Sequence, residues 1–564
     1  MSKEEKGSNI HFGTDGWRAI IGDDFTVENL VKVVDAAART FKAAAVEAGA
    51  QLENPGVLYV GHDCRKDAHL YASIAALTAA EHGFDVKLTE DYCPTPTLCW
   101  SVAHDDEAVG GIMLTSSHNP AEYLGVKLRM ADGGASPAEF TDLVEKVMED
   151  TNEPCTDDPA IAALAALDID DVRTAVDFAK TEAAVTDAIK VQVEADEVAE
   201  RTEEAAGKDA AHDAALVAIA EAPVDDAVDV PALILQMVPV ETAETKPVQT
   251  VDLMTPYLAA LKELVDVDAI RDANLHVVVD PLFGAGRGYL AGLLRDMGVE
   301  VTEINNACDP TFDGLHPEPI PPWVDRGLAK ADEVSADALF INDGDADRIG
   351  AGDSEGNFVN PHRIITLVTK HMVDRGETGK VVSTITASAL LDRLCRKLGL
   401  ELVSTPVGFK WIYGEMEKGG VMIGGEESGG IGLPGHVKER DGLLMALLLT
   451  EMMAQSGKDL GALVAEMLDE LGTLEFTRRG LTVTDEQMEK FRNETIPNAN
   501  PMEINTVPVI GVDRRDGVKF LLEGDAWVMM RPSGTEPLVR IYAEASTIDE
   551  VEQLLEWAEK VVCC

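Results

Sequence analysis

Three aspartates alternate in the segment Asp343-Gly344-Asp345-Ala346-Asp347, directly after an apolar run that ends at Ile341. Residues at positions i, i+2 and i+4 of an extended chain share one side, so these carboxylates converge. Converging carboxylates repel one another unless a cation lies between them, and an all-oxygen ligand set suits Mg²⁺ better than Zn²⁺. An EF-hand loop is not expected, because its twelfth position, counted from Asp343, holds Ser354 instead of Glu. A solvated acidic turn is the alternative.

A second stretch with chemical potential runs from the apolar residues 110–114 into Thr115-Ser116-Ser117-His118-Asn119-Pro120. This pattern is typical of a buried strand that delivers a hydroxyl group to the mouth of a site. Pro120 disfavours a helical Asn119, so Ser117 is expected on a stiff turn beside His118. Taken alone, the stretch fits an ordinary serine-rich loop equally well.

Three further loops have glycine-spaced polar residues. The segment 531–535 offers the Arg531 guanidinium, two hydroxyls and backbone N–H groups around a glycine, which is the chemistry of a phosphate cradle. Glu426 and Ser428 lie in a glycine-flanked loop where a backbone can approach a ligand closely, and they suit paired sugar hydroxyls. The loop Phe12-Gly13-Thr14-Asp15-Gly16-Trp17-Arg18 ends in a cation. Each of these loops alone also fits a structural turn.

The composition limits the class of partner. The chain has 564 residues, with 101 acidic and 47 basic residues and a net charge of -54. Nucleic acids and anionic membranes need basic patches, so neither is an expected partner. An anionic substrate must therefore meet local clusters of Arg and Lys. The polar N-terminus, the lack of a membrane-length apolar run and eight cysteines without a C-x-x-C pair predict a cytoplasmic protein with reduced thiols.

The length predicts several domains. Alternating strand and helix signals predict layered α/β domains over residues 1–155, 246–355 and 356–472, followed by a smaller α+β domain over 473–564. Residues 156–245 are rich in Ala, Asp and Glu, and we expect a solvated helical insertion whose apolar run Pro231–Val240 docks on the body. The turn Pro281–Gly288 lacks the full dinucleotide-binding fingerprint and predicts tight strand-to-helix packing.

Together, five stretches closely resemble the α-D-phosphohexomutase family in order and approximate spacing, over the whole chain outside about residues 156–245. They are Phe12-Gly13-Thr14-Asp15-Gly16-Trp17-Arg18, Thr115-Ser116-Ser117-His118-Asn119-Pro120, Asp343-Gly344-Asp345-Ala346-Asp347-Arg348, Gly425-Glu426-Glu427-Ser428-Gly429-Gly430 and Arg531-Pro532-Ser533-Gly534-Thr535-Glu536-Pro537. The family usually has Ala where this chain has Ser116, which leaves two adjacent serines.

The resemblance implies four domains, each of which contributes one motif to a central cleft. Ser117 would carry a phosphoryl group, and Mg²⁺ would be bound by Ser117, Asp343, Asp345 and Asp347. The resemblance places catalytic roles on Ser117, His118, Lys127, Arg18 and Arg348, with His118 and Lys127 both open as the proton-transfer group. It places sugar binding on Glu426 and Ser428, and binding of the idle phosphate on Arg531, Ser533, Gly534, Thr535 and Arg540.

The expected activity is that of a phosphoglucomutase, which interconverts glucose 1-phosphate and glucose 6-phosphate through a phosphoserine enzyme, with glucose 1,6-bisphosphate as intermediate and activator. A phosphomannomutase or an enzyme of dual specificity is the nearest alternative, because glucose and mannose differ only at C2. Phosphoglucosamine mutase is less favoured, since Gly430 stands where that branch usually has His. A non-catalytic sugar-phosphate sensor and a metal-dependent phosphatase are the remaining alternatives. The expected partner is a small hexose phosphate, and the chain is a monomer or a dimer.

Overall fold

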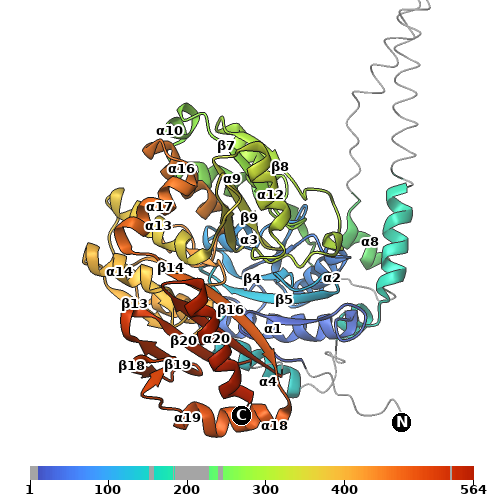
Figure 1. Cartoon of the computed structure of the whole chain (residues 1–564). Coiled ribbons are helices and arrows are strands. Elements are labelled where there is room, and N and C mark those ends of the chain that lie inside the picture. Colours follow the sequence, from blue (N-terminus) through green and yellow to red (C-terminus); the bar gives the residue numbers. More distant parts are fainter. Residues whose placement is uncertain are drawn as a thin grey trace, which may run out of the picture.

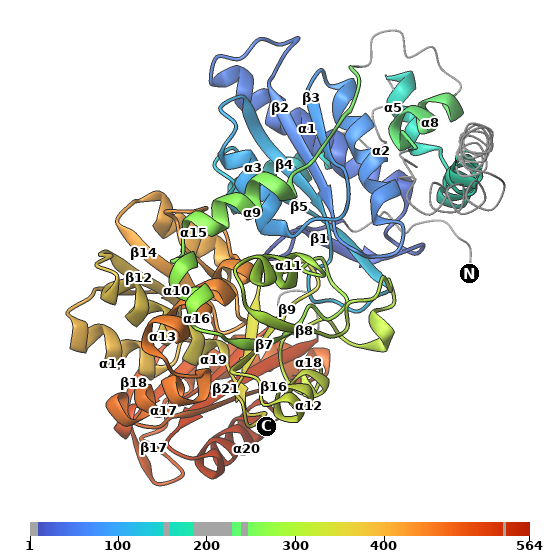
Figure 2. The same ribbon diagram turned by 90° about the horizontal axis from the view of Figure 1, so that it is seen from above.

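The computed structural model describes residues 10–150, 158–181, 183, 228–238, 246–533 and 537–563. The chain folds into four units (Figure 1). The first and the fourth lie on opposite sides of the molecule in Figure 2. The first three units are layered α/β units, whereas the fourth is built on an antiparallel sheet. This arrangement confirms the predicted fold class.

Six strands form the sheet of the first unit, in the order β1-β5-β4-β2-β3-β6. Strand β2 is parallel to β3 and β4, whereas β5 is antiparallel to β4 and β1. The strands are β1 (Trp17–Ile20), β2 (Val57–His62), β3 (Asp85–Thr89), β4 (Ala108–Leu114), β5 (Tyr123–Met130) and β6 (Gln249–Val251). The helices are α1 (Val27–Glu47), α2 (Ala68–Glu81), α3 (Thr95–Ala103) and α4 (Ala138–Asp150). Because β4 and β5 pair with each other, both ends of the turn that carries Ser117 are fixed.

The i, i+4, i+7 spacing of Leu70, Ile74 and Leu77 before Gly83 predicts a helix with one apolar face, and α2 lies there and ends before Gly83, whose φ is 87°. The expectation of a single apolar face was too narrow, because nearly every residue of α2 is buried. One side of α2 packs on β2 and β3, and it also contacts α5 (Pro159–Ala165) and α8 (Val230–Met237). Its alanines are small enough to pack between these neighbours.

Helix α5, the helical residues 169–181 and α8 belong to the predicted insertion, and the expectation of a solvated segment does not hold for one face of α5 and of residues 169–181. Ile161, Leu164, Val172, Val176 and Ile234 are buried in the same core cluster as α1 and α2. The Ala-rich composition concealed these apolar residues, which form a packed face. The docking predicted for Pro231–Val240 is confirmed for α8, and residues 184–227 lie outside the described residues.

The second unit has a five-stranded sheet in the order β11-β10-β9-β7-β8. Its strands are β7 (His276–Asp280), β8 (Glu300–Glu303), β9 (Ala338–Asn342), β10 (Ile349–Gly352) and β11 (Phe358–Val359). Its helices are α9 (Met254–Glu263), α10 (Val267–Asp272), α11 (Tyr289–Asp296), α12 (Asp325–Val334) and the short 3-10 turn η1 (Phe312–Gly314). Since β6 pairs with β3 of the first sheet, this unit begins with α9 and not at residue 246.

The third unit has the strand order β13-β12-β14-β15, with β12 parallel to β13 and β14. Its strands are β12 (Lys380–Thr384), β13 (Leu402–Thr405), β14 (Val421–Gly425) and β15 (Ile431–Gly432). Its helices are α13 (Pro361–Asp374), α14 (Ala389–Leu398), α15 (Phe409–Glu417), α16 (Gly442–Ser456) and α17 (Leu460–Leu471). Helix α16 is almost entirely buried and packs against α10 and β10, so it joins the third unit to the second.

The fourth unit has a six-stranded sheet in the order β16-β21-β20-β19-β18-β17, and α20 packs on it. Its strands are β16 (Glu475–Thr482), β17 (Glu503–Ile504), β18 (Val507–Asp513), β19 (Val518–Leu522), β20 (Trp527–Pro532) and β21 (Leu538–Ala545). Its helices are α18 (Asp485–Lys490), η2 (Phe491–Thr495), α19 (Ile496–Asn498) and α20 (Ile548–Cys563), with the short turn η3 (Glu523–Asp525). No helix in the described part of the chain is both long and apolar enough to cross a bilayer.

We predict that Ile234→Ala lowers the free energy of unfolding by about 2–4 kcal/mol, because it leaves a cavity in the core shared with the first unit. Phe178 lies in the same insertion with 69% of its surface exposed, so Phe178→Ala is the matched control and should leave stability nearly unchanged. Urea unfolding of both variants measures the difference. Equal stability of the two variants would show that α8 does not contribute to this core.

Candidate active site

The three predicted aspartates lie in the connection from β9 to β10, and all three are fully buried. One carboxylate oxygen from each of Asp343, Asp345 and Asp347 lies within 4.8 Å of the others. Burial, followed by the charges of Asp347 and Asp345, raises the pKa of Asp343 well above its usual value. Buried like charges at this separation require a cation or protons to offset them.

Ser117 reaches the same cluster from the first unit. Its Oγ donates a hydrogen bond to Asp343 Oδ2 at 2.9 Å, and its backbone N–H donates to Thr115 Oγ1 at 2.9 Å. The φ of Ser117 is 51°, a left-handed backbone conformation that residues other than Gly rarely adopt. The Oγ of Ser116 is buried without a hydrogen-bond partner among the described residues. Of the two adjacent serines, Ser117 is therefore the one that points at the aspartates.

The turn of Ser117 is held by Arg65, which the sequence analysis missed. The buried guanidinium pairs through Nε with Asp63 at 3.1 Å, and Asp63 also accepts a hydrogen bond from Thr115 Oγ1 at 2.6 Å. At 2.6–3.0 Å the guanidinium donates to the backbone carbonyls of Ser117, Asn119, Pro120 and Tyr123. The available signal was the charged pair Asp63 and Arg65 directly after the buried strand β2. Arg65 thus fixes the backbone of the turn that carries Ser117.

Lys127, on β5, supplies positive charge to the aspartates. Its Nζ lies 2.7 Å from Asp345 Oδ2, 2.9 Å from Asp347 Oδ2 and 3.0 Å from Asp15 Oδ2. Burial opposes the lysine charge, but these three carboxylates outweigh burial and raise the pKa of Lys127. The ammonium group contacts the Oδ2 atoms of Asp345 and Asp347 and does not pair with their Oδ1 atoms.

The open oxygens, Oδ1 of Asp345 and Oδ1 of Asp347, are buried and have no hydrogen-bond partner among the described residues. Buried polar atoms are rarely left unpaired, and two such carboxylate oxygens side by side are suited to bind a cation. Carboxylate oxygens and one serine oxygen are hard ligands of the kind that bind Mg²⁺. The residues of this loop therefore fit the expected metal.

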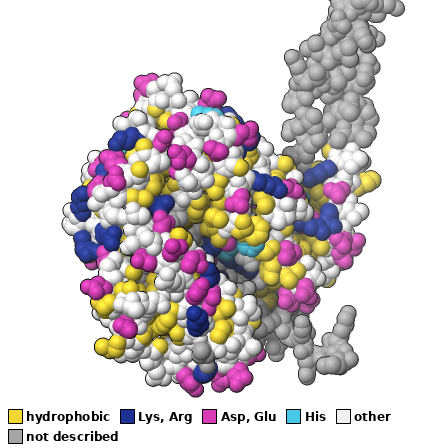
Figure 3. All heavy atoms as spheres, in the orientation of Figure 1, with side chains coloured by type: hydrophobic (Ala, Val, Ile, Leu, Met, Phe, Trp, Pro, Cys, Tyr) yellow, Lys and Arg dark blue, Asp and Glu magenta, His cyan; other side chains and the backbone are white. Residues whose placement is uncertain are grey.

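His118, Arg18 and Arg348 also lie at this cluster. His118 Nδ1 is 3.5 Å from Ser117 Oγ, and burial together with Arg348 and Arg18 holds the pKa of His118 well below its usual value. Arg18 Nη1 donates to Asn119 Oδ1 at 3.0 Å, and the Arg348 backbone N–H donates to Asp343 Oδ1 at 3.1 Å. Figure 3 shows histidine and basic side chains near the centre of one face, and further basic side chains lie among the acidic ones toward its edge.

The predicted sugar-binding loop joins β14 to β15 and is tied to the aspartate loop. The Ile349 backbone N–H donates to Gly429 O at 3.0 Å, which places the two loops side by side. Burial raises the pKa of Glu426 to about 7, and its Oε1 accepts from Gly408 N at 3.1 Å. The buried Oγ of Ser428 has no hydrogen-bond partner among the described residues. A carboxyl group and a free hydroxyl thus lie close to the aspartate cluster.

Arg440 is a second residue that the sequence analysis missed, although its charged surroundings at 438–441 between apolar runs were visible. Its Nη2 pairs with Asp347 Oδ2 at 2.8 Å and also with Asp15. Its Nη1 lies 3.9 Å from Glu426 Oε2. Arg440 therefore connects the sugar-binding loop to the first and second units.

The predicted phosphate cradle lies in the fourth unit, at the end of β20. Arg531 Nε pairs with Asp516 Oδ2 at 2.8 Å, and Arg531 stands opposite Arg540 on the neighbouring β21. The buried Ser533 donates its backbone N–H to Leu538 O at 2.7 Å. Gly534 and Thr535 lie outside the described residues. The structure pairs Arg531 with Asp516 in its own unit, and not with the cluster around Ser117.

Comparison with known proteins agrees with this division into units. Four domains described as parts of phosphoglucomutase/phosphomannomutase match in order: alpha/beta/alpha domain I at residues 9–154, domain II at 255–356, domain III at 360–471, and the C-terminal domain at 492–560. The chain belongs to this α-D-phosphohexomutase family. It is therefore an enzyme of carbohydrate metabolism that transfers a phosphoryl group within a sugar phosphate.

Relatives of this phosphohexomutase have different names. The chain is 27% identical to a phosphoglucomutase/phosphomannomutase of Thermococcus kodakarensis, over 98% of each protein. It is 26% identical to a protein of Methanothermobacter thermautotrophicus named probable phosphoglucosamine mutase, over 97% of this chain and 96% of the relative. A crystal structure of a candidate phosphomannomutase from Thermus thermophilus is 31% identical, covers 98% of this chain and 99% of its own, and has a TM-score of 0.72. These names establish the family without the sugar.

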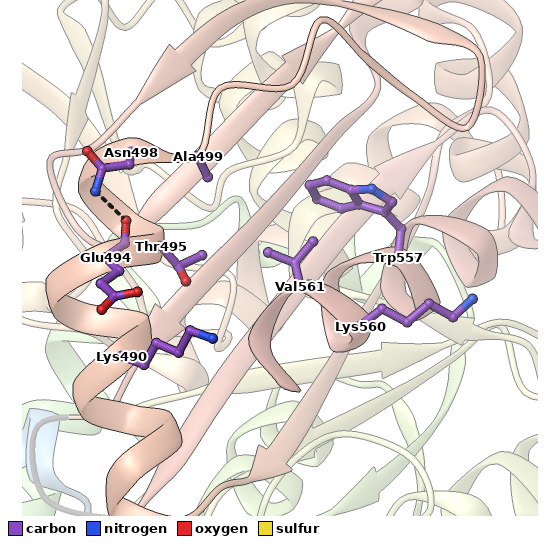
Figure 4. A pocket seen from close by; sticks show the side chains of 8 residues that line it. All are labelled: Lys490, Glu494, Thr495, Asn498, Ala499, Trp557, Lys560 and Val561. Carbon is purple, nitrogen blue, oxygen red and sulfur yellow. Dashed lines mark hydrogen bonds between the residues drawn. The ribbon is translucent and has the colours of Figure 1, made fainter. Parts of the chain in front are cut away.

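The phosphohexomutase also has a hollow of about 640 Å³ on the fourth unit, between η2, α19 and α20 (Figure 4). Its lining comprises Lys490, Glu494, Thr495, Asn498, Ala499, Trp557, Lys560 and Val561. None of the residues predicted for catalysis, metal binding or sugar binding lines it. The cluster of Ser117 and the aspartates, and not this hollow, is therefore the candidate active site.

We predict that Arg65→Lys lowers kcat by about 100-fold, because a lysine cannot reproduce the fork of donors and the serine loses its position. The KM should change little, since Arg65 touches the turn and not the space where the sugar would bind. Arg173→Lys is the control, because Arg173 pairs with Asp67 in the same unit and its side chain is 31% exposed. Steady-state kinetics of both variants test this; wild-type kcat in Arg65→Lys would refute the positioning role.

We predict that Mg²⁺ raises the melting temperature of the protein, because a cation that binds only the folded state stabilises it by about 2.7 kcal/mol at 100 times its dissociation constant. Asp345→Asn should reduce this Mg²⁺-dependent shift. Asp296→Asn, at an exposed position paired with Lys262, should keep the full shift. Thermal melts over a Mg²⁺ series provide the measurement. A wild-type protein whose melting is insensitive to Mg²⁺ would exclude the site.

Proposed function

We propose that this protein is a phosphoglucomutase, which interconverts glucose 1-phosphate and glucose 6-phosphate through phosphorylated Ser117 and glucose 1,6-bisphosphate. The observation that carries the proposal is the 2.9 Å hydrogen bond from Ser117 Oγ to Asp343 Oδ2, beside the open oxygens of Asp345 and Asp347. This geometry puts a nucleophilic hydroxyl next to a cation site, as phosphoryl transfer requires.

In the proposed reaction, the bond between phosphorus and Ser117 Oγ breaks while a bond forms to a sugar hydroxyl. The same serine then takes back the other phosphoryl group of the bisphosphate. Mg²⁺ held by Ser117, Asp343, Asp345 and Asp347 would supply positive charge against the transferring group. Arg18 and Arg348 add fixed positive charges beside it.

Each half of the reaction moves one proton, because the accepting hydroxyl loses a proton and the releasing oxygen gains one. His118 is one candidate, since its Nδ1 lies 3.5 Å from Ser117 Oγ. Lys127 is the other, since its ammonium group lies 2.7 Å from Asp345 and thus beside the metal site. We propose that these two residues handle the protons, in an order that the pH dependence of single variants would establish.

We propose that Glu426 and Ser428 bind two neighbouring sugar hydroxyls. The support is the unused buried hydroxyl of Ser428 and the position of Glu426 next to Arg440. O3 is common to glucose and mannose, which is why a phosphomannomutase or a dual-specificity enzyme is the second candidate. The name phosphoglucomutase/phosphomannomutase of the Thermococcus relative supports testing both sugars.

The idle phosphate needs a binding place that is the same in both orientations of the bisphosphate. We propose the cradle of the fourth unit for this role, with the residues Arg531, Ser533, Gly534, Thr535 and Arg540. Arg531 would exchange its partner Asp516 for the phosphate, and the bound phosphate would draw the fourth unit toward Ser117. Such closure would keep water from the phosphorylated serine.

The test compares glucose 1-phosphate, mannose 1-phosphate and glucosamine 1-phosphate at equal Mg²⁺ and with catalytic amounts of the matching bisphosphate. We expect the highest kcat/KM for glucose 1-phosphate, phosphate mapped to Ser117, and loss of essentially all turnover in Ser117→Ala. Ser116→Ala is the adjacent control and should remain active. A preference for mannose 1-phosphate would select the second candidate, and a fully active Ser117→Ala enzyme would overturn the mechanism.

A further inference from the structure

Arg478 and Arg479 are consecutive residues of β16 and therefore point to opposite faces of the fourth sheet. Arg479 pairs with Glu559 at 3.1 Å and with Glu552, both on α20. Arg478 instead pairs with Glu318, which belongs to the second unit. One face of β16 thus serves the packing of its own unit, while the other brings a guanidinium to a neighbouring unit.

Glu318 lies in the segment His316-Pro317-Glu318-Pro319, which is attached to the aspartate loop. The backbone N–H of Gly344, between Asp343 and Asp345, donates to Pro317 O at 3.1 Å. Gly350, at the start of β10, lies so close that an added Cβ would meet Pro319 O at 2.6 Å. The ion pair of Arg478 and Glu318 therefore connects the fourth unit to the loop that carries the metal ligands.

The segment that contains Glu318 also lies near the turn of Ser117. His316 and His118 have ring centroids 6.4 Å apart. The charges of Arg348 and Arg478 add to burial in lowering the pKa of His118. They also lower the pKa of Glu318, against the effect of its burial. Glu318 is thus a carboxylate of the second unit that pairs with Arg478 of the fourth, two residues after the histidine that faces His118.

We propose that Arg478 is a further phosphate-binding residue of this enzyme, and that Glu318 holds its guanidinium until a phosphate group of the substrate replaces the carboxylate. This inference rests on the proposed phosphohexomutase reaction at Ser117. A phosphate dianion is a stronger charge-assisted acceptor for a guanidinium than a carboxylate is. The exchange would replace the ion pair between the second and fourth units by an ion pair between the substrate and the fourth unit.

The exchange also has a use in catalysis. The bisphosphate must turn over between the two transfers, so that the phosphoryl group just transferred leaves Ser117 and the other one reaches it. A cation on β16 that follows the phosphate would keep the fourth unit over the site during this turn. Arg478 is suited to this role, because it stands on a regular strand paired to β21 along its whole length and not on a loop.

The test compares substitutions of Arg478 and Glu318, which should change the affinity for the bisphosphate in opposite directions. In a Ser117→Ala background that prevents turnover, Arg478→Gln should weaken the binding of glucose 1,6-bisphosphate by about ten-fold or more, the usual effect of losing a charge-assisted hydrogen bond. Glu318→Gln should tighten binding by about two- to five-fold, because the competing carboxylate of an incompletely buried ion pair is removed. Arg479→Gln, on the opposite face, should leave the dissociation constant unchanged. Isothermal titration calorimetry of the full chain provides the three values.

An ion pair that only stabilises the structure would weaken binding in both variants, or in neither, and either result would overturn the proposal. Equal binding by Arg478→Gln and Arg479→Gln would do the same. Melting temperatures of all variants verify that each chain is folded. The titrations are repeated with inorganic phosphate, whose weakened binding in Arg478→Gln supports the site independently of the sugar. A wild-type chain that binds phosphate but no hexose bisphosphate would refute the proposed function and leave the role of Arg478 decided by the phosphate titrations.

Discussion

The electrostatic cost of three buried aspartates is the constraint on which the rest of this structure depends. Their oxygens lie within 4.8 Å of one another in a fully buried loop, where neither water nor distance weakens the repulsion. The protein offsets this cost with cations from separate units: Lys127 from the first unit and Arg440 from the third, both in direct contact with Asp347. The cluster therefore depends on the assembly of the first three units, because the aspartates of the second unit are paired with cations of the first and the third.

Backbone contacts transmit this constraint through the molecule. The turn Pro281–Gly288 was expected only to pack a strand on a helix, but an added Cβ at Gly284 would meet Gly344 O at 2.7 Å, so the turn supports the aspartate loop directly. The carbonyl groups of the Ser117 turn converge on Arg65, and the hydrogen bond from Ile349 to Gly429 fixes the sugar-binding loop to the same centre. Each connection lets the loops keep strained conformations, such as the left-handed Ser117, that isolated turns would lose.

The net charge of -54 and the proposed anionic substrate are reconciled by the separation of charges in space. Histidine and basic side chains lie near the centre of the face shown in Figure 3, and further basic side chains lie among the acidic ones toward its edge. A phosphate at the cluster would meet the local cations Arg18, Arg348 and Arg440, which act against the overall negative charge. In the proposed mechanism, an arginine that pairs with a carboxylate, such as Arg531 with Asp516, would exchange that carboxylate for a phosphate.

The sequence by itself determined the layered α/β fold class, the helix at Ala68–Glu81 and the loops of Ser117 and Asp343–Asp347, because these features depend on spacing between near neighbours. The composition of the insertion suggested a solvated segment, but Val172 and Val176 of that segment are buried against the first unit. Only the tertiary structure decided that Ser117 and not Ser116 meets Asp343, and that Arg65 holds the turn. Partners of this kind lie about 50 to 230 positions apart, and their pairing is set by strand order and side-chain direction, which local spacing does not encode.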